Sequence, residues 1–292
     1  MRDGKIMNQS QSEKTSATGR TVIQSYDELC LWWQKDYEEH KHLAGKYTGV
    51  PSGFGGLDQL TWGFQRGEMA ILAARTSMGK TALASQMMVN MVELGHKVAY
   101  FTLELKNTVM FWRLLSQLAD VPFQNLRSYQ LSEDHIDRLQ TAMGKYYGMN
   151  RLTFIEGQGV TLAQMRALGQ DMAKSGHEIL FVDFLSLLRT STEAQKNERI
   201  GEVSKYLRWL SLALSLPIVA LSQLNRAAGQ GEPGLENIRW SGEIEEDADL
   251  ALLLYLGSDK IHRLKAAKNR NGPTGEIKLR FDGPRMSFTE VK

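Results

Sequence analysis

The sequence Met69-Ala-Ile-Leu-Ala-Ala-Arg-Thr-Ser-Met-Gly-Lys-Thr81 decides the fold of this chain. Its first five residues are apolar and predict a buried strand, and the residues after Thr81 have the periodicity of a helix. A strand, a Gly-Lys-Thr turn and a helix form the context of a phosphate-binding loop, because backbone amides and the helix N-terminus attract an anion. We therefore predict that residues 74–81 bind nucleotide phosphates.

Two side chains of this loop are expected to act directly. Lys80 can reach the β- and γ-phosphates, and the Thr81 hydroxyl can bind Mg²⁺. Ala74 stands where the general pattern has glycine, and the turn accepts it if its φ is negative. A chance Gly-Lys-Thr is the alternative, which the preceding strand disfavours. The predicted nucleotide-binding set is Ala74, Arg75, Thr76, Ser77, Met78, Gly79, Lys80 and Thr81.

Apolar segments alternate with helical patterns along the rest of the chain. Strands are predicted at residues 69–73, 98–103, 152–155, 179–182, 217–221 and 250–256. Such runs, apolar on both faces and separated by helices, indicate an α/β fold with a mostly parallel sheet covered on both faces. Residues 261–267 and 277–281 flank a turn with glycine and proline, and they predict a C-terminal antiparallel β-hairpin.

Carboxylates follow two of these strands. Asp183 ends one of them and suits a group that holds Mg²⁺ through water at the carboxyl edge of the sheet. Phe184 follows it, so the base that orients the attacking water must come from another strand. Glu104 is the best candidate, because RecA-like sheets place its strand beside that of Asp183. Without this context, a glutamate at a strand end is more often solvated.

Polar side chains near the later strands complete the predicted site. Gln223 can sense the γ-phosphate and relay it to residues 225–242, although a water-facing strand end is equally consistent. Lys268 and Arg270 lie two residues apart, on one side of an extended chain near the hairpin tip, where they can bind one anion. A solvated pair is the ordinary alternative, but P-loop motors often need an arginine from a neighbouring subunit.

The N-terminal part divides into a polar tail and a helix. Residues 1–24 lack apolar periodicity and predict a disordered tail. Ser25 and Glu28 fit a capping box, and Leu29, Trp32 and Trp33 repeat at helical spacing up to about residue 42. Residues 45–56 carry several glycines and a proline and predict a linker. The expected domains are thus 1–24, a linker and oligomerisation helix at 25–48, and the main domain at 49–292.

Composition excludes several classes of protein. No run of about 18 uncharged apolar residues occurs and the N-terminus is polar, so neither a membrane span nor a secretory signal is expected, and a cytoplasmic location is. Cys30 is the single cysteine, which excludes an internal disulfide. The net charge is +2, so any contact with nucleic acid must come from local placement, as in a protein that lines a channel.

Six segments, in this order, resemble the motor domain of DnaB-type replicative helicases. They are Gly49-Val-Pro-Ser-Gly-Phe54, Ala73-Ala-Arg-Thr-Ser-Met-Gly-Lys-Thr81, Phe101-Thr-Leu-Glu-Leu105, Ala220-Leu-Ser-Gln-Leu-Asn-Arg226, Glu245-Glu-Asp-Ala-Asp249 and Lys268-Asn-Arg-Asn-Gly-Pro-Thr-Gly275. The resemblance implies a RecA-like fold and a hexameric ring that binds ATP and Mg²⁺ between subunits. It also implies 5′ to 3′ movement on single-stranded DNA, unwinding of forked DNA, and a helicase loader as partner.

The same resemblance assigns roles to single residues. Lys80 and Thr81 bind nucleotide, Asp183 serves Mg²⁺ and Glu104 is the catalytic base. The resemblance makes Gln223 the phosphate sensor, and makes Lys268 and Arg270 act on the neighbour's ATP.

The DNA contacts are expected between the last two parallel strands. They comprise Arg226, Arg239, Trp240 and Gly242, where the family commonly reads Arg-Glu-Ser-Gly and this chain has Arg-Trp-Ser-Gly. Trp240 is expected either to stack on a base or to pack on a neighbour. A primase contact is doubtful, because the family usually meets primase through an N-terminal collar domain and only residues 1–48 precede the motor here.

Two other functions remain as alternatives. A RecA-like or RadA-like recombination ATPase shares the phosphate-binding loop and Glu104, but the segment at residues 268–275 favours the helicase. A DNA-dependent ATPase switch or loader that does not unwind is the second.

Overall fold

The computed structural model describes residues 15–16, 19–20, 25–41, 47–183, 196–225, 231–239 and 241–291. Its contacts divide the chain into two units, Met1–Lys46 and Tyr47–Lys292. Most of the predicted tail at residues 1–24 lies outside the described part. Its described residues form β1 (Thr15–Ser16) and β2 (Gly19–Arg20), which pair in antiparallel fashion.

The N-terminal unit contains helix α1 (Tyr26–His40). The capping box is confirmed, because the Glu28 amide donates to Ser25 Oγ at 3.2 Å and the Ser25 amide donates to a Glu28 carboxylate oxygen at 2.6 Å. Several apolar side chains of the helix are exposed, among them Leu29, which is 44% accessible, and Trp33, which is 58% accessible. The rings of Trp33 and Tyr37 stack at 5.4 Å. The helix therefore presents an aromatic surface to its surroundings.

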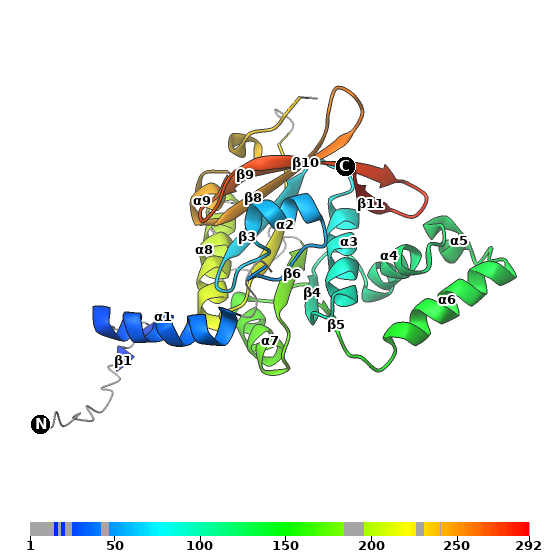
Figure 1. The fold of residues 1–292 in the computed structure, drawn as a ribbon. Helices are drawn as coiled ribbons and strands as arrows, with labels where there is room; N and C mark the ends of the chain where they lie inside the picture. The colour runs from blue at the N-terminus through cyan, green and yellow to red at the C-terminus, as the bar shows by residue number, and fades with distance from the viewer. Residues whose placement is uncertain are drawn as a thin grey trace, which may run out of the picture. The chain divides into compact units, whose positions relative to one another are not determined.

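The larger unit is built on one mixed sheet (Figure 1). Its strands are β3 (Met69–Ala74), β4 (Val98–Thr102), β5 (Leu152–Glu156), β6 (Ile179–Asp183), β7 (Ile218–Gln223), β8 (Leu250–Leu256), β9 (His262–Asn269), β10 (Gly275–Asp282) and β11 (Ser287–Glu290). Their spatial order is β11-β10-β9-β8-β3-β7-β6-β4-β5. The strands from β8 to β5 pair in parallel, and those from β8 to β11 pair in antiparallel fashion. The predicted α/β fold and C-terminal hairpin are confirmed, with β11 added.

Helices cover both faces of this sheet (Figure 1). One face carries α2 (Gly55–Thr61), α3 (Lys80–Glu93) and α4 (Asn107–Ala119), and the other carries α7 (Leu162–Lys174), α8 (Lys196–Leu214) and α9 (Ser241–Asp247). Strand β3 has apolar residues on both faces of the sheet. Leu72 packs into the core beneath α2, α3 and α4, Ile71 packs into the core beneath α7, α8 and α9, and both are fully buried. A strand with apolar residues on both faces needs a cover on each.

A smaller apolar cluster lies beside the first face. It joins α4 to α5 (Phe123–Ser128) and α6 (Glu133–Tyr146) through Leu115, Leu126 and Leu139. A short 3₁₀ helix, Leu235–Asn237, precedes α9. Among the described helices, none combines the length and apolar character needed to cross a membrane.

The linker predicted at residues 45–56 is wrong for its described part, residues 47–56. Val50 forms a β-bridge with Phe64, and Phe54 is only 2% exposed. The glycine at 49 permits close approach, because a Cβ there would lie 2.5 Å from the Phe64 carbonyl oxygen. The Pro- and Gly-rich composition therefore reflects tight packing of backbone within the domain and not a flexible connection.

Candidate active site

The phosphate-binding loop joins β3 to α3 with the geometry that its sequence predicts. Ala74 is buried at the end of β3 and is not among the described residues with positive φ, so alanine is accepted there without strain. Ser77 and Gly79 have φ of 66° and 88° and curl the loop so that its amides can surround an anion. Lys80 then begins α3.

Packing also requires glycine at position 79, and the sequence alone did not reveal this requirement. A Cβ there would lie 2.9 Å from the Phe288 ring, which comes from β11. Phe288 is 2% exposed and packs on Phe281 with ring centroids 4.6 Å apart. His262 closes this cluster edge-on, and burial lowers the pKa of its imidazole. The C-terminal strands thus form an apolar support beneath the loop.

The predicted nucleotide and metal residues converge on one carboxylate. Lys80 Nζ lies 3.7 Å from Asp183 Oδ1, and Thr81 Oγ1 donates to Asp183 Oδ2 at 3.2 Å. Burial lowers the pKa of the Lys80 ammonium, and the charges of Asp183 and Glu104 oppose that shift. A partly buried cation of this kind is well matched to a phosphate ligand.

The donors fit a magnesium ion that shares its ligands with a nucleotide. Asp183 is 3% exposed, and its Oδ1 has no hydrogen-bond partner in the described part of the chain. In that same part, no cluster of three or more His, Cys, Asp or Glu is placed to hold a metal alone. Mg²⁺ commonly takes one or two protein carboxylates together with phosphates and water. Thr81 and Asp183 are suited to be its protein ligands.

Tyr100 also contacts this carboxylate, and sequence reasoning missed it. Its hydroxyl donates to Asp183 Oδ2 at 2.6 Å. Burial, together with Asp183, raises the pKa of the Tyr100 hydroxyl well above its ordinary value. The available signal was a polar atom within an otherwise apolar strand, since a buried tyrosine usually finds a partner for its hydroxyl.

Strand β4, which precedes Glu104, lies next to the strand of Asp183, as predicted. Strands β4 and β6 pair in parallel with Thr102 opposite Asp183, and the Leu103 amide donates to the Asp183 carbonyl at 2.8 Å. The Thr102 hydroxyl closes the following turn by accepting from the Leu105 amide at 3.1 Å. This turn leaves Glu104 exposed at the carboxyl edge of the sheet, where a water molecule can reach it.

Gln223 is physically linked to the predicted DNA segment. It lies opposite Ala74 in the β3–β7 pair, and its carbonyl accepts from the Arg239 amide at 2.8 Å. The Arg239 guanidinium also donates to Gln223 Oε1 at 3.4 Å. Arg226 and Trp240 lie outside the described residues, whereas Gly242 lies in the first turn of α9. The described part therefore joins the nucleotide edge to one of the predicted DNA residues.

Lys268 and Arg270 lie together, but they face the end of α9 in their own chain. Lys268 Nζ donates to the Glu245 carbonyl at 2.5 Å, and Arg270 Nη2 donates to the Glu246 carbonyl at 3.2 Å. Arg270 Nη1 also lies 3.0 Å from Asp249 Oδ1. Carbonyls at a helix C-terminus attract cations. In this structure the anion beside Arg270 is thus a carboxylate of its own chain.

Asp249 is the anchor of this arrangement and was not predicted as a site residue. It is 2% exposed, and its Oδ2 accepts from the Met69 amide at 3.0 Å. Its Oδ1 also lies 3.2 Å from an Arg208 nitrogen. A carboxylate directly before a buried strand was the signal available in the sequence.

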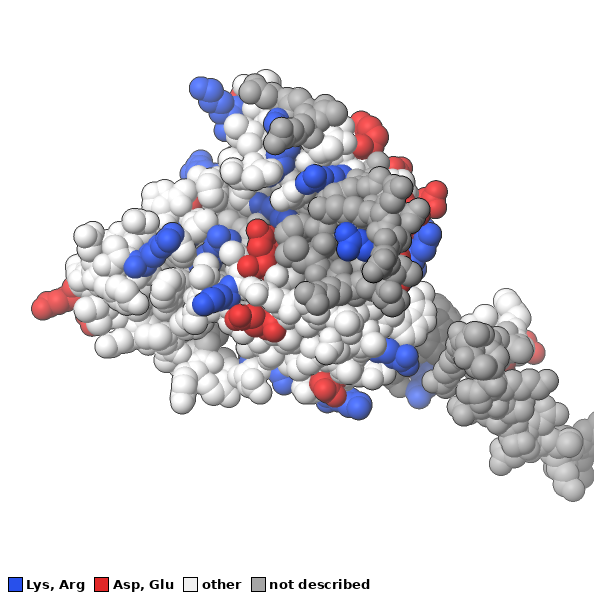
Figure 2. Space-filling model, turned by 180° about the vertical axis from the view of Figure 1, so that it is seen from behind, with Lys and Arg blue, Asp and Glu red and all other residues white. Residues whose placement is uncertain are grey.

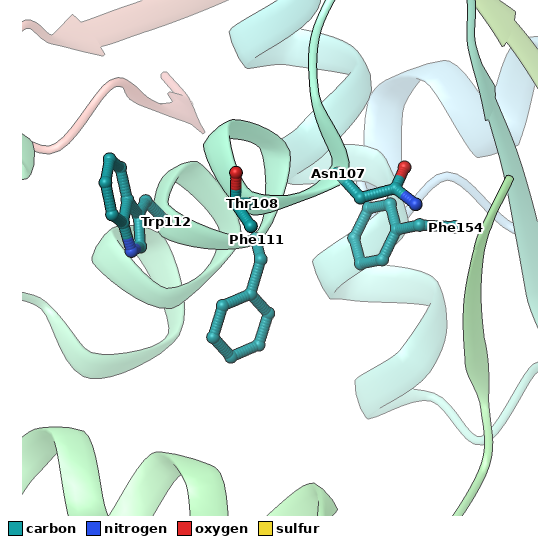
Figure 3. Close-up of a pocket in the computed structure, with 5 residues that line it drawn as sticks. All are labelled: Asn107, Thr108, Phe111, Trp112 and Phe154. Atoms are coloured by element: carbon teal, nitrogen blue, oxygen red, sulfur yellow. The ribbon is translucent and has the colours of Figure 1, made fainter. Parts of the chain in front are cut away.

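Apolar hollows lie away from the phosphate-binding loop. One, of about 380 Å³, is lined by Asn107, Thr108, Phe111, Trp112 and Phe154. Figure 3 shows Phe111 projecting from α4, with Trp112 to one side and Phe154 to the other. A groove of about 420 Å³ between α3, α4, α6 and β5 shares Phe111 and Phe154 with it. None of the loop residues lines either hollow, so both are distinct from the nucleotide site.

Charge is mixed on the face of the molecule drawn in Figure 2. Basic and acidic side chains alternate there among neutral ones. This distribution agrees with the small net charge of +2. Contacts with a polyanion are therefore expected from single loops rather than from a broad basic surface.

The fold and the site together define a P-loop nucleoside triphosphatase of the RecA-like class. The sheet topology, the loop before α3 and the carboxylate at the end of β6 are its defining features. Residues 49–290 match the family model for the DnaB-like helicase C terminal domain, and the chain belongs to that family. Membership implies nucleotide binding and hydrolysis.

Known proteins agree with this assignment. The chain is 34% identical over 295 residues to the replicative DNA helicase DnaC of Bacillus subtilis (strain 168), covering 94% of this chain and 63% of that protein. A solved structure of an ATPase domain matches with a TM-score of 0.85 and 29% identity, covering 93% of this chain and all of that one. A second solved structure, of a DnaB-like replicative helicase and its interactions with primase, matches with a TM-score of 0.83 and 29% identity. The match covers 92% of this chain and 69% of that one.

Proposed function

We propose that this chain is the motor of a ring-forming replicative DNA helicase that hydrolyses ATP with Mg²⁺. It moves 5′ to 3′ along single-stranded DNA and unwinds the duplex at a fork. The observation that carries the proposal is the convergence of Lys80 and Thr81 on Asp183, with Glu104 in the turn that follows the adjacent strand β4. The helicase relatives support it, although the chain spans about 63% of the length of the first of them.

The proposed hydrolysis uses groups at one edge of the sheet. The loop amides and Lys80 bind the phosphates, and Thr81 and Asp183 hold the metal. When bound, Mg²⁺ would neutralise phosphate charge as the terminal bond breaks. Glu104 orients the attacking water from its exposed turn. The proposal requires little reorganisation for catalysis, because these groups all come from one chain.

The proposed coupling to DNA runs through Gln223. Its side-chain amide lies at the nucleotide edge and already accepts from Arg239. A γ-phosphate that attracts this amide would change the hydrogen bond to Arg239, and thereby the position of the loop that follows. Arg226, Arg239, Trp240 and the backbone at Gly242 are proposed to contact the phosphates and bases of single-stranded DNA.

Arg270 and Lys268 are proposed to act on the ATP of a neighbouring subunit. Arg270 is half exposed, and its partner Asp249 is a single carboxylate. Arg270 would gain electrostatic energy by leaving this carboxylate for a more highly charged phosphate. The ion pair with Asp249 therefore suits the position of Arg270 before a neighbouring subunit binds ATP. In the proposed hexamer, each Arg270 would lie beside the phosphate-binding loop of the next subunit.

The N-terminal helix is proposed to join subunits independently of nucleotide. The exposed rings of Trp33 and Tyr37 require cover, and exposed aromatic surfaces often mark an interface. The proposed organisation is thus a tail at 1–24, a joining helix at 25–48 and the motor at 49–292. A helicase loader and a cytoplasmic location remain predictions, and so does the doubtful contact with primase.

A forked DNA substrate tests the proposal. Strand separation at catalytic protein concentrations, dependent on ATP and Mg²⁺, is the expected result. ATP-dependent binding without separation would instead identify a DNA-dependent switch or loader. The recombination ATPase is not favoured, because the family match and the relatives are helicases.

A further inference from the structure

Tyr100 has an unusual environment for a residue buried in the parallel part of the sheet. It lies in β4, its side chain is fully buried, and its ring packs edge-on against Phe154. The β4–β6 register places Tyr100 opposite Phe181, two residues before Asp183. The long tyrosine side chain therefore reaches diagonally across to the carboxylate. Its hydroxyl is a polar atom in an apolar core whose one described partner is Asp183.

The hydrogen bonds of Asp183 are unequally divided between its two oxygens. Oδ2 accepts from Tyr100 at 2.6 Å and from Thr81 at 3.2 Å. Oδ1 is buried, has no hydrogen-bond partner in the described part of the chain, and lies 3.7 Å from Lys80 Nζ. Two donors on one oxygen fix the rotation of the carboxylate about its Cβ–Cγ bond. The other oxygen is thereby directed toward the lysine of the phosphate-binding loop.

We propose that Tyr100 is a positioning residue whose hydroxyl orients Asp183 for the metal bound with the nucleotide. This inference rests on the proposed function, because it assigns Asp183 to Mg²⁺. Tyr100 itself touches neither the nucleotide nor the metal and acts through the carboxylate. Groups that orient a metal ligand in this way commonly contribute 10-fold to 100-fold to metal affinity.

Packing alone does not account for the tyrosine. The ring lies in the core on one face of the sheet and packs against Phe154 of β5, and phenylalanine would fill the same space. The hydroxyl is the additional feature, and its described hydrogen bond goes to Asp183. Tyr100→Phe therefore removes the hydrogen bond to Asp183 and nearly preserves the volume of the side chain.

Tyr146 provides a matched control. Its hydroxyl also donates to a carboxylate, Glu93, at 2.9 Å. Glu93 ends α3 and Lys80 begins it, so the control hydrogen bond lies roughly 20 Å from the loop along this helix. Tyr146→Phe removes the same chemical group without touching the site.

The experiment titrates Mg²⁺ against binding of a fluorescent ATP analogue to the full chain. Tyr100→Phe should need about 10-fold or more Mg²⁺ to reach half-maximal binding, whereas Tyr146→Phe should match the unmodified chain. With EDTA present, all three should bind the analogue equally, because Lys80 and the loop are intact. Equal Mg²⁺ midpoints for Tyr100→Phe and the unmodified chain would overturn the proposal.

A double-mutant cycle with Asp183→Asn tests whether the effect passes through the carboxylate. Tyr100→Phe should then change the Mg²⁺ midpoint much less than it does beside an intact Asp183. An unchanged effect, or a Tyr100→Phe chain that loses its fold while Tyr146→Phe keeps it, would assign the hydroxyl a structural role. Failure of the unmodified chain to show Mg²⁺-dependent binding would instead contradict the proposed function.

Discussion

The parallel and antiparallel parts of the sheet present their charged groups in opposite ways. At the carboxyl edge of the parallel part, Lys80 and Thr81 meet a buried Asp183 within one chain. In the antiparallel part, Lys268 and Arg270 bind helix carbonyls and Asp249, and half of the Arg270 side chain is exposed. In the parallel part, the proposed site is formed by groups that already contact one another. In the antiparallel part, the cations bind partners that another anion could replace. The difference suggests that only the first acts on the chain's own nucleotide.

The largest expected effect lies in the parallel part. Lys80→Ala should abolish tight ATP binding, because it removes the buried cation that meets ground-state phosphate charge. Glu104→Gln should retain binding and lose about 10² to 10⁴ in hydrolysis rate, because the glutamate matters chiefly for positioning water. Binding of a fluorescent analogue and steady-state ATPase separate the two.

Lys97→Ala is a suitable control for both variants. Lys97 precedes β4 at the opposite edge of the sheet, where its Nζ donates to the Ser175 carbonyl. It should leave nucleotide binding and ATPase unchanged. Normal hydrolysis by Glu104→Gln would show that another group is the base.

The next effect concerns the antiparallel part. Arg270→Ala should lower ATPase by roughly 10³-fold if it serves as an arginine finger. Mixing Arg270→Ala with Lys80→Ala subunits should restore some ATPase, because some interfaces then pair an intact loop with an intact arginine. No recovery in mixtures shown to co-assemble would count against a shared site.

Arg263→Ala controls for damage to the hairpin. Arg263 lies on β9, the strand that leads into Arg270, and pairs with Asp259 at 2.7 Å. It should retain ATPase without mixing. Equal losses for Arg263→Ala and Arg270→Ala would indicate that the hairpin is needed for structure alone.

The same contrast explains what the sequence could predict. The positions of β3, β4 and β6 follow from short apolar runs, and the ends of parallel strands meet at one edge by topology, so the sequence predicts Lys80 and Asp183 together. The choice of Glu104 also depends on the strand order of RecA-like sheets. Local patterns carry no information on which distant side chains pair. The contact between Tyr100 and Asp183 therefore required the structure.

The remaining misses have related causes. Strand β11 is four residues long and three of them are polar, so its pairing with β10 decides its structure more than its propensity does. Residues 47–56 resemble a linker in composition, but their glycines allow backbone to pack closely. The pair between Arg270 and Asp249 was hidden because an exposed arginine near a turn has no preferred partner in sequence.

A smaller effect is expected from helix α1, which belongs to neither part of the sheet. Deleting residues 1–44, or changing Trp32 and Trp33 together to alanine, should leave a folded domain that binds ATP but assembles poorly. DNA-stimulated ATPase should fall with assembly, because Arg270 then lacks a neighbouring site. Light scattering measures the oligomer.

Gln34→Ala changes an exposed polar position of the same helix and should assemble normally. If the deleted protein forms the same oligomer at the same concentration as the full chain, α1 does not join the subunits. The cations of the antiparallel part would then need another interface to reach a neighbour.

The smallest expected effect is on DNA affinity, and it concerns the segment that links the parallel and antiparallel parts of the sheet. In the sequence, residue 240 stands between Arg239 and helix α9. Arg239 binds Gln223 of the parallel part, and the C-terminal carbonyls of α9 bind Lys268 and Arg270. A tryptophan that stacks on a base contributes roughly 1 to 3 kcal/mol. Trp240→Ala should therefore weaken single-stranded DNA binding about 10-fold at fixed salt while leaving DNA-free ATPase intact, as fluorescence anisotropy and ATPase assays would measure. Trp209→Ala, which removes an exposed tryptophan from α8, should leave DNA affinity unchanged. If Trp240→Ala binds DNA normally, the side chain packs on protein, and any coupling of the two parts by DNA must pass through Arg239 or the backbone at Gly242.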